Sequence, residues 1–322
     1  MDYSGLLARK YRVGRKLTDE ERSNQFSQKR RLDVTPLYDL SVIRIDSTYL
    51  ECVDRWFVYR GSMAAMCLIG IAFPVFFFLI PLLVEVGIDF IALSIFFGIV
   101  IPYWLFVSWL LLKESFRWTH FPIRFNYRNR MVYVFTPDGT VLKAKWNKIF
   151  FTLGRCQWIS GSQNWDIRGH MLDKDGETVL ATFALPGDST QVQRLRRSWE
   201  FFRRYMEEGP ASVYRDVYWC QDIVGQRETY TAGLRNLFFR YNGFRFAGIP
   251  FYCLLILQAL TVFLSPFLFV ASLGRWFAMR TSKIPVWPAE IEAQCHVDAF
   301  DPYRRDASHN PEKMPMESIR DE

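Results

Sequence analysis

Two long apolar runs dominate the hydropathy pattern of this chain. They lie between Arg60 and Lys113, and charged residues interrupt them only in the short link 85–89. The runs, 63–84 and 90–112, are each long enough to cross a hydrocarbon core of roughly 30 Å as a helix. Because the link is too short to return across a bilayer, the pattern predicts a transmembrane hairpin with both outer ends on one side.

The composition of these runs favours membrane helices over core helices of a soluble protein. A core helix normally keeps a polar stripe, whereas phenylalanines here fall all round both predicted helices. Pro74, Pro81 and Pro102 are also better tolerated in a membrane span. Basic residues flank the outer ends and the link is acidic, so the positive-inside rule predicts cytoplasmic outer ends and a cytoplasmic N-terminus.

After the hairpin, apolar and polar residues alternate with the period of strands. Pro137-Asp138-Gly139 and Asp173–Gly176 have the composition of tight turns. About five to seven antiparallel strands at short spacing are typical of a curled sheet or a small barrel. The predicted strands are 121–127, 131–136, 140–146, 149–153, 166–172 and 177–185.

An amphipathic helix is predicted over 189–208. Its apolar residues recur at steps of three and four, Asp188 or Ser189 can cap its start, and Gly209-Pro210 ends it. The apolar stripe consists of Val192, Leu195, Trp199, Phe202 and Met206. We expect this helix to close the sheet, so that the fold class is an α+β membrane protein.

The remaining segments complete the predicted organisation. The run 246–274 spans once, or it forms a hairpin bent near Ser265-Pro266, and the pattern leaves both open. We expect residues 301–322 to be disordered. The predicted parts are an N-terminal arm (1–60), the hairpin (61–112), the β domain (113–210), an amphipathic connector (211–245), a C-terminal membrane segment (246–280) and a polar tail (281–322).

Charge and cysteine content narrow the class of protein. The net charge is +7, but the basic residues are spread through segments that flank apolar runs. This distribution favours the anionic leaflet of a membrane over nucleic acid as the partner of that charge. The six cysteines show no paired spacing, so we interpret them as free thiols in a reducing compartment.

Few residues suggest catalysis or metal binding. His170 lies in a predicted strand near Asp166, Asp173 and Asp175, but alternation and the turn separate these side chains. Cys295-His296-Val297-Asp298 contains nucleophile, base and acid types, although adjacency does not make a triad. No Walker, HExxH or GxSxG motif occurs. We therefore predict a protein that is not an enzyme and that has no cofactor and no metal site.

Several stretches together resemble a known family. DSTYLECVDRWF (46–57), IRFNYRNRMVYVF (123–135), WDIRGHMLDKDG (165–176) and GRWFAMRTSKIPVWPAEIEA (274–293) are similar to uncharacterised proteobacterial membrane proteins often encoded near type VI secretion clusters. The strands and closing helix resemble bacterial pleckstrin-homology-like domains. The resemblance spans roughly residues 40–305, and it implies a multi-pass protein of the bacterial inner membrane without a catalytic motif.

Three functional hypotheses follow. The first is a type VI secretion immunity or accessory protein whose cytoplasmic domain binds a protein partner, such as an effector. The second is a lipid-responsive sensor or scaffold that binds anionic headgroups, and the third is a membrane enzyme. Candidate partner-facing or lipid-facing residues are Arg124, Tyr127, Arg128, Arg130, Trp158, Trp165 and Arg168.

Overall fold

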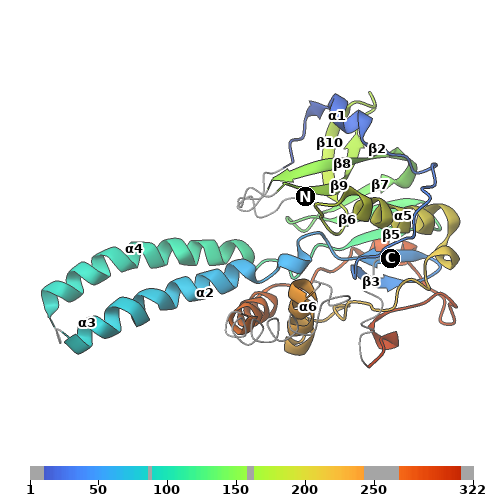
Figure 1. Cartoon of the computed structure of the whole chain (residues 1–322). Coiled ribbons are helices and arrows are strands. Elements are labelled where there is room, and N and C mark those ends of the chain that lie inside the picture. Colours follow the sequence, from blue (N-terminus) through green and yellow to red (C-terminus); the bar gives the residue numbers. More distant parts are fainter. Residues whose placement is uncertain (1–10, 86–88, 158–162, 243–267, 313–322) are drawn as a thin grey trace, which may run out of the picture. The chain divides into compact units, whose positions relative to one another are not determined.

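The chain folds into two compact units, shown in a computed structural model (Figure 1). The structure describes residues 11–85, 89–157, 163–242 and 268–312. Unit 1 consists of Met1–Phe57, His120–Gln226 and Ile284–Met316, and unit 2 of Val58–Thr119, Arg227–Lys283 and Glu317–Glu322. Both units are therefore assembled from segments that are far apart in the sequence.

The first sheet of unit 1 joins segments from both sides of the hairpin. Its five strands follow one another in the antiparallel order β3-β4-β5-β6-β7. β4 precedes the hairpin and β5 follows it, and they pair with Leu50 opposite Phe125. Gly139, at φ 85°, supplies the predicted turn between the last two strands. The strands are β3 (Val42–Ile45), β4 (Tyr49–Cys52), β5 (Ile123–Asn126), β6 (Met131–Phe135) and β7 (Val141–Lys145).

The second sheet has the antiparallel order β1-β10-β9-β8-β2. The second predicted turn, with Gly176 at φ 70°, connects β9 to β10. Two short strands from the N-terminal segment form its edges. The strands are β1 (Arg15–Lys16), β2 (Gln25–Phe26), β8 (Ile149–Gln157), β9 (Gln163–Leu172) and β10 (Thr178–Ala184).

The described strands form two separate sheets, and no closed barrel. The consecutive strands β7 and β8 belong to different sheets because the 3-10 turn η3 (Trp146–Lys148) redirects the chain between them. Trp146 is fully buried there and packs on Phe125 from one sheet and Phe151 from the other. The sequence pattern predicted the antiparallel strands correctly, but it did not show where the sheet divides.

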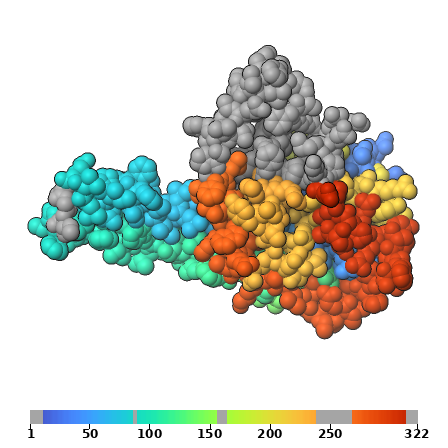
Figure 2. Space-filling model, turned by 90° about the horizontal axis from the view of Figure 1, so that it is seen from below, coloured from blue at the N-terminus to red at the C-terminus, as the bar shows by residue number. Residues whose placement is uncertain are grey.

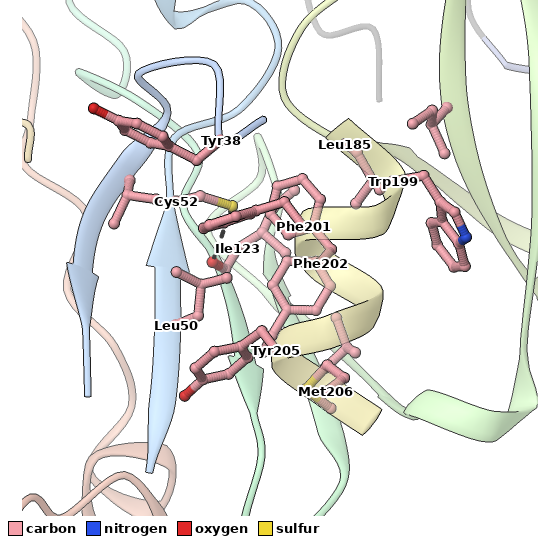
Figure 3. Close-up of a cluster of buried hydrophobic side chains, with 14 of the residues drawn as sticks. Tyr38, Leu50, Cys52, Ile123, Leu185, Trp199, Phe201, Phe202, Tyr205 and Met206 are labelled. Atoms are coloured by element: carbon pink, nitrogen blue, oxygen red, sulfur yellow. Dashed lines mark hydrogen bonds between the residues drawn. The ribbon is translucent and has the colours of Figure 1, made fainter. Parts of the chain in front are cut away.

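Helix α5 (Val192–Glu208) covers the core between the two sheets (Figure 3). Its predicted apolar stripe is buried except for Val192, which is half-buried, and Trp199, Phe202 and Met206 are fully enclosed. The helix begins three residues later than predicted because the backbone of Ser189 pairs with Trp165 in extended form, through hydrogen bonds of 2.8 and 3.0 Å. It ends at Gly209 and Pro210, as predicted.

Residues 11–57 of the predicted N-terminal arm are part of unit 1. Besides β1 to β4 they form α1 (Asp19–Ser23), which Thr18 and Glu21 cap reciprocally. Phe26 stacks on Trp199 of α5 with ring centroids 5.4 Å apart. The two-residue strands β1 and β2 are too short to produce a recognisable alternation, and neighbouring strands determine them.

The predicted connector and polar tail are also partly built into unit 1. Residues 211–226 follow on from η4 (Pro210–Ser212) and bury Val213, Val217 and Cys220 in the core, while residues 227–242 belong to unit 2. Residues 284–312 lie against the first sheet and contain α8 (Ala289–Gln294) and η5 (Ala307–His309). We call residues 284–312 the C-terminal strap. The sequence predicts disorder over 301–322. Specific polar contacts order residues 301–312, and residues 313–322 lie outside the described residues.

Unit 2 contains the two predicted apolar helices. α2 (Ser62–Pro74), the π-helical turn η2 (Val75–Leu79) and α3 (Ile80–Glu85) follow one another directly, and α4 (Phe90–Glu114) is continuous. Both helical stretches are long and apolar enough to cross a membrane, and most of their surface is exposed. The prediction of two potential spans is thereby confirmed.

The π-helical turn lies between two prolines, Pro74 and Pro81, which cannot donate backbone hydrogen bonds. The amide of Val75 donates to Ala72, three residues back, and the indole of Trp104 on α4 donates to the carbonyl of Ile71 at 3.1 Å. A side chain of the second helix thus binds a backbone group at the irregular turn of the first.

Two further helices complete the described part of unit 2. They are α6 (Tyr230–Asn242) and a helix over 268–281. Of the membrane segment predicted over 246–280, residues 246–267 lie outside the described residues, so the choice between one span and a bent hairpin is not resolved within them.

Candidate interaction surface

A row of polar side chains crosses the outer face of the first sheet. Glu51, Arg124, Tyr133 and Lys143 are direct cross-strand neighbours on β4 to β7. Strand alternation sends them away from the core, toward which Leu50 and its neighbours Phe125 and Val132 point. We call these four residues the polar row.

Arg124 is the centre of the polar row. Its guanidinium lies 4.7 Å from the ring centroids of both Tyr49 and Trp287, and it pairs with Glu51 at 3.2 Å and with Glu292 at 2.9 Å. Burial disfavours its charge, but the carboxylates, Glu51 foremost, raise the pKa of Arg124 above its usual range. The residue is only 5% exposed, so it is an internal contact between the sheet and the strap.

The C-terminal strap supplies partners for the whole polar row. Trp287 donates its indole N–H to Glu51 at 2.7 Å, and Glu290 pairs with Lys143. Glu292 binds Arg124, and Gln294 accepts the hydroxyl hydrogen of Tyr133 at 2.5 Å. Four polar contacts, one of them made by the tryptophan, thus hold a segment of eight residues (287–294) on the sheet.

The far end of the strap is fixed by backbone contacts. Arg305 exchanges backbone hydrogen bonds of 2.8 and 3.0 Å with Ile45 at the edge strand β3. Asp301 accepts from the amide of Ser47 at 2.9 Å. Asn310 accepts from the amide of Cys220 at 2.7 Å and donates to its carbonyl at 2.8 Å. The strap therefore binds both β3 and the segment that follows α5.

A second polar cluster is buried beside the other sheet. The carboxylate of Asp166 on β9 pairs with Arg55 and with Arg168, the latter at 2.9 Å, and accepts from the hydroxyl of Tyr11 at 2.9 Å. Gly154 on β8 lies directly beneath the Arg168 side chain, where a Cβ atom would approach within 2.3 Å. The contacts of this Asp166 cluster are internal to unit 1, and they join the N-terminal segment to the sheet.

The seven predicted surface residues fall into different environments. Arg124 is buried beneath the strap and Arg168 lies in the Asp166 cluster, so neither presents its charge to a partner. Arg128 is exposed and pairs with Asp298 of the strap at 3.2 Å. Tyr127, Arg130 and Trp165 are half-buried, and Trp158 lies outside the described residues.

The candidate catalytic residues serve other contacts in the described structure. His170 is buried, with Nδ1 2.8 Å from the Thr182 hydroxyl and Nε2 3.3 Å from Glu21. Although burial opposes it, hydrogen bonds with His170 and Arg15 hold the pKa of Glu21 below its usual range. Cys295 points to Asn126, and burial raises the pKa of its thiol. His296 is exposed and Asp298 binds Arg128, so the tetrapeptide side chains do not converge.

Sequence reasoning missed a polar cluster at the base of the hairpin in unit 2. Glu114, the last residue of α4, accepts from the amides of Gly61 and Ala64 at 2.7 and 2.8 Å, so it caps the start of α2. Arg275 binds both carboxylate oxygens of Glu228 at 2.7 and 3.0 Å, and each side chain of this pair is 2% exposed. The sequence shows that Glu114 and Arg275 each lie at the end of an apolar run, but it does not show which groups they bind.

These observations define the class of protein: an α+β protein with two antiparallel sheets and two apolar helices that could span a membrane. Its chain belongs to DUF6708, a family of unknown function, whose model matches residues 101–299. The matched range contains β5 to β10, α5 and α8. No curated protein and no solved structure matches the chain.

Proposed function

We propose that this protein is a non-enzymatic membrane-anchored binding protein. Unit 2 supplies the anchor, since its two apolar helices leave large side chains such as Phe76, Phe77 and Phe90 more than half exposed. Large contiguous apolar surface of this kind is compatible with lipid and unfavourable in water. Unit 1 supplies the binding domain.

A pleckstrin-homology-like description of unit 1 is part of the proposal. Four strands, β4 to β7, belong to one sheet, three strands, β8 to β10, form the centre of the other, and α5 follows directly and covers the core. This order is what the sequence resemblance implies. β1, β2 and β3 are additions from the N-terminal segment.

The observation that carries partner binding is the attachment of the C-terminal strap. Unit 1 holds an extended segment of its own chain through a tryptophan anchor and the polar row. Its sheet surface is therefore suited to hold a peptide by an aromatic anchor and paired charges. Following the family resemblance, we propose that the partner is a type VI secretion effector or a component that loads it.

The contact surface that we propose for this partner lies beside the strap, where predicted residues remain at the surface. Arg128 is exposed, and Arg130 is half-buried and pairs with Glu207 at 2.5 Å. Both follow β5 in the same turn. In this proposal the domain lies at the cytoplasmic face of the bacterial inner membrane, where it meets an effector before export, in an immunity or accessory role.

An affinity pull-down of the full-length protein from its own cells in mild detergent tests this proposal. Wild type and Lys174→Glu, a charge reversal in the exposed turn of the second sheet, should recover a secreted effector or a secretion component. The double variant Arg128→Glu/Arg130→Glu should lose it. Equal recovery by all three proteins would exclude this surface. Recovery of lipid alone would favour the lipid-responsive scaffold instead.

A further inference from the structure

The helix over 268–281 in unit 2 buries polar residues and exposes aromatic ones, which is the reverse of a surface helix in a soluble protein. Its inward face carries Ser272 and Arg275, which are 2% and 1% exposed, together with small residues. Its outward face carries Phe269 and Trp276, which are 56% and 45% exposed. A helix that buries an arginine and turns its aromatic residues outward is typical of contact with lipid.

The inward polar groups of this helix are fully engaged. Arg275 binds Glu228 through two hydrogen bonds, and it also donates to the carbonyl of Arg60 at 3.2 Å. Ser272 meets the hydroxyl of Tyr230 at 2.9 Å and donates to the carbonyl of Phe269 at 2.7 Å. These contacts fix the rotation of the helix, and the aromatic face must therefore point outward.

Close backbone packing places this helix at the base of the hairpin. A Cβ atom on Gly274 would lie 2.4 Å from the amide nitrogen of Ala65, and one on Gly61 would lie 2.1 Å from the Cα of Arg275. Beyond the helix, Lys283 exchanges backbone hydrogen bonds with Arg117 and Thr119, at 2.6 and 2.8 Å. In Figure 2 residues of this helix, in orange, lie at the surface next to the hairpin, in cyan.

The same base carries two more exposed aromatic residues with basic neighbours. Trp109, near the end of α4, is 48% exposed and lies 4.6 Å from the ammonium group of Lys113. Phe116 is 54% exposed. Its backbone has φ 63°, a conformation that residues other than glycine rarely adopt. Its ring packs edge-on against Phe277 at 6.2 Å. We call Trp109, Phe116, Phe269 and Trp276 the aromatic collar.

We propose that the aromatic collar is a membrane-interface site that seats unit 2 among the headgroups of anionic lipids. The inference rests on the proposed membrane anchoring, because the collar is continuous with the exposed apolar surface of the hairpin. Aromatic rings favour the headgroup level of a bilayer, and exposed basic residues attract anionic lipids there. Arg117 and Arg280 are exposed beside the collar and supply that charge.

Depth-dependent fluorescence quenching tests the proposal. The full-length chain, with its native cysteines replaced by alanine, is labelled at one introduced cysteine and reconstituted into vesicles of phosphatidylcholine and phosphatidylglycerol. Trp276→Cys probes the collar, Phe76→Cys probes the first apolar helix, and Lys174→Cys probes a charged turn of unit 1. The quenchers are nitroxides attached to the acyl chain near the headgroup or near the methyl end.

We expect the shallow quencher to act best at position 276, the deep quencher to act best at position 76, and neither to act at position 174. With headgroup-specific quenchers, the signal at 276 should favour phosphatidylglycerol, and Arg117→Gln/Arg280→Gln should abolish that preference. Quenching at position 76 without quenching at position 276 would overturn the proposed role of the aromatic collar, while the proposed membrane anchoring would stand. No quenching at 76 would overturn the anchoring itself.

A second copy of the chain is the other possible occupant of this surface. In that case the probe at position 276 would be shielded in lipid-free detergent, and its emission would shift on dilution of the protein. Either result would contradict the proposal, because a lipid-covered collar responds to lipid and is independent of protein concentration.

Discussion

Arg124 joins three parts of unit 1 through one side chain. It comes from a strand that follows the hairpin, stacks on Tyr49 from a strand that precedes it, and stacks on Trp287 from the C-terminal strap. A guanidinium is planar and weakly hydrated, so it can lie between two rings and still bind carboxylates. Its role was not visible in the sequence, where Arg124 looked like one basic residue among many.

We predict that Arg124→Lys destabilises unit 1 by about 1–2 kcal/mol, because an ammonium group keeps the charge and loses the planar stacking. The midpoint of urea unfolding, followed by tryptophan fluorescence, measures this loss. Arg128→Lys is the matched control. Its exposed ion pair with Asp298 should change stability by no more than about 0.5 kcal/mol. Equal shifts in the two variants would contradict the stacked geometry.

The C-terminal strap is the element whose docking can be measured most directly. Burial foremost raises the pKa of Cys220 to about 12, so near neutral pH its thiol is protonated as well as buried. Labelling of this cysteine therefore requires local opening of the chain around it. Asn310 closes that site with two hydrogen bonds.

Asn310→Ala should accelerate alkylation of Cys220 by roughly thirtyfold, since two hydrogen bonds are worth about 1 kcal/mol each. Peptide mapping by mass spectrometry identifies the labelled residue. Pro311→Ala, at the exposed next position, should leave the rate unchanged. If Cys220 reacts at the wild-type rate in both variants, the strap does not control access to it.

In unit 2 the helix over 268–281 packs on α2 through backbone rather than through side chains. Gly274→Val would place new atoms against the backbone of Ala65, which cannot move away as a side chain can. We expect a loss of about 1–3 kcal/mol, seen as a lower melting temperature in detergent by circular dichroism. Gly98→Val on α4 has open space around it and should melt near the wild type. A similar melting temperature for both variants would rule out the close contact.

The connectivity of the whole molecule restricts how the proposed membrane anchoring can be arranged. Unit 1 contains chain from before the hairpin, from after it, and from the strap beyond residue 283. β4 pairs with β5 across the hairpin, and Arg305 pairs with Ile45. In the proposed membrane anchoring, one folded unit lies on one side of the bilayer, so both outer ends of the hairpin and the strap would share that side.

Reporter fusions test this arrangement. In the proposed orientation, green fluorescent protein should be active when fused to the N-terminus or to the C-terminus, because both would lie in the cytoplasm. Alkaline phosphatase should be active only when inserted between Glu85 and Asp89, at the tip of the hairpin. Phosphatase activity at the C-terminus would mean that the chain between residues 227 and 283 crosses the membrane once, and it would contradict the docking of the strap.

Local pattern was sufficient for much of this architecture. The apolar helices, the turns at Gly139 and Gly176, most of the strands and the apolar stripe of α5 each depend on residues close together in the chain. Periodicity and turn chemistry report such neighbours directly. The same pattern identified Arg124, Arg128 and Arg168 as basic residues of the β domain, but it could not tell exposed from buried arginines.

Long-range pairing determined the rest. The division into two sheets, the edge strands β1 and β2, the strap on the polar row and the Arg275–Glu228 pair all join residues that are distant in sequence. Short strands and single charges carry no periodic signal of their own. Their partners are set by which surfaces meet when the core closes, and that depends on the three-dimensional fold of the entire chain.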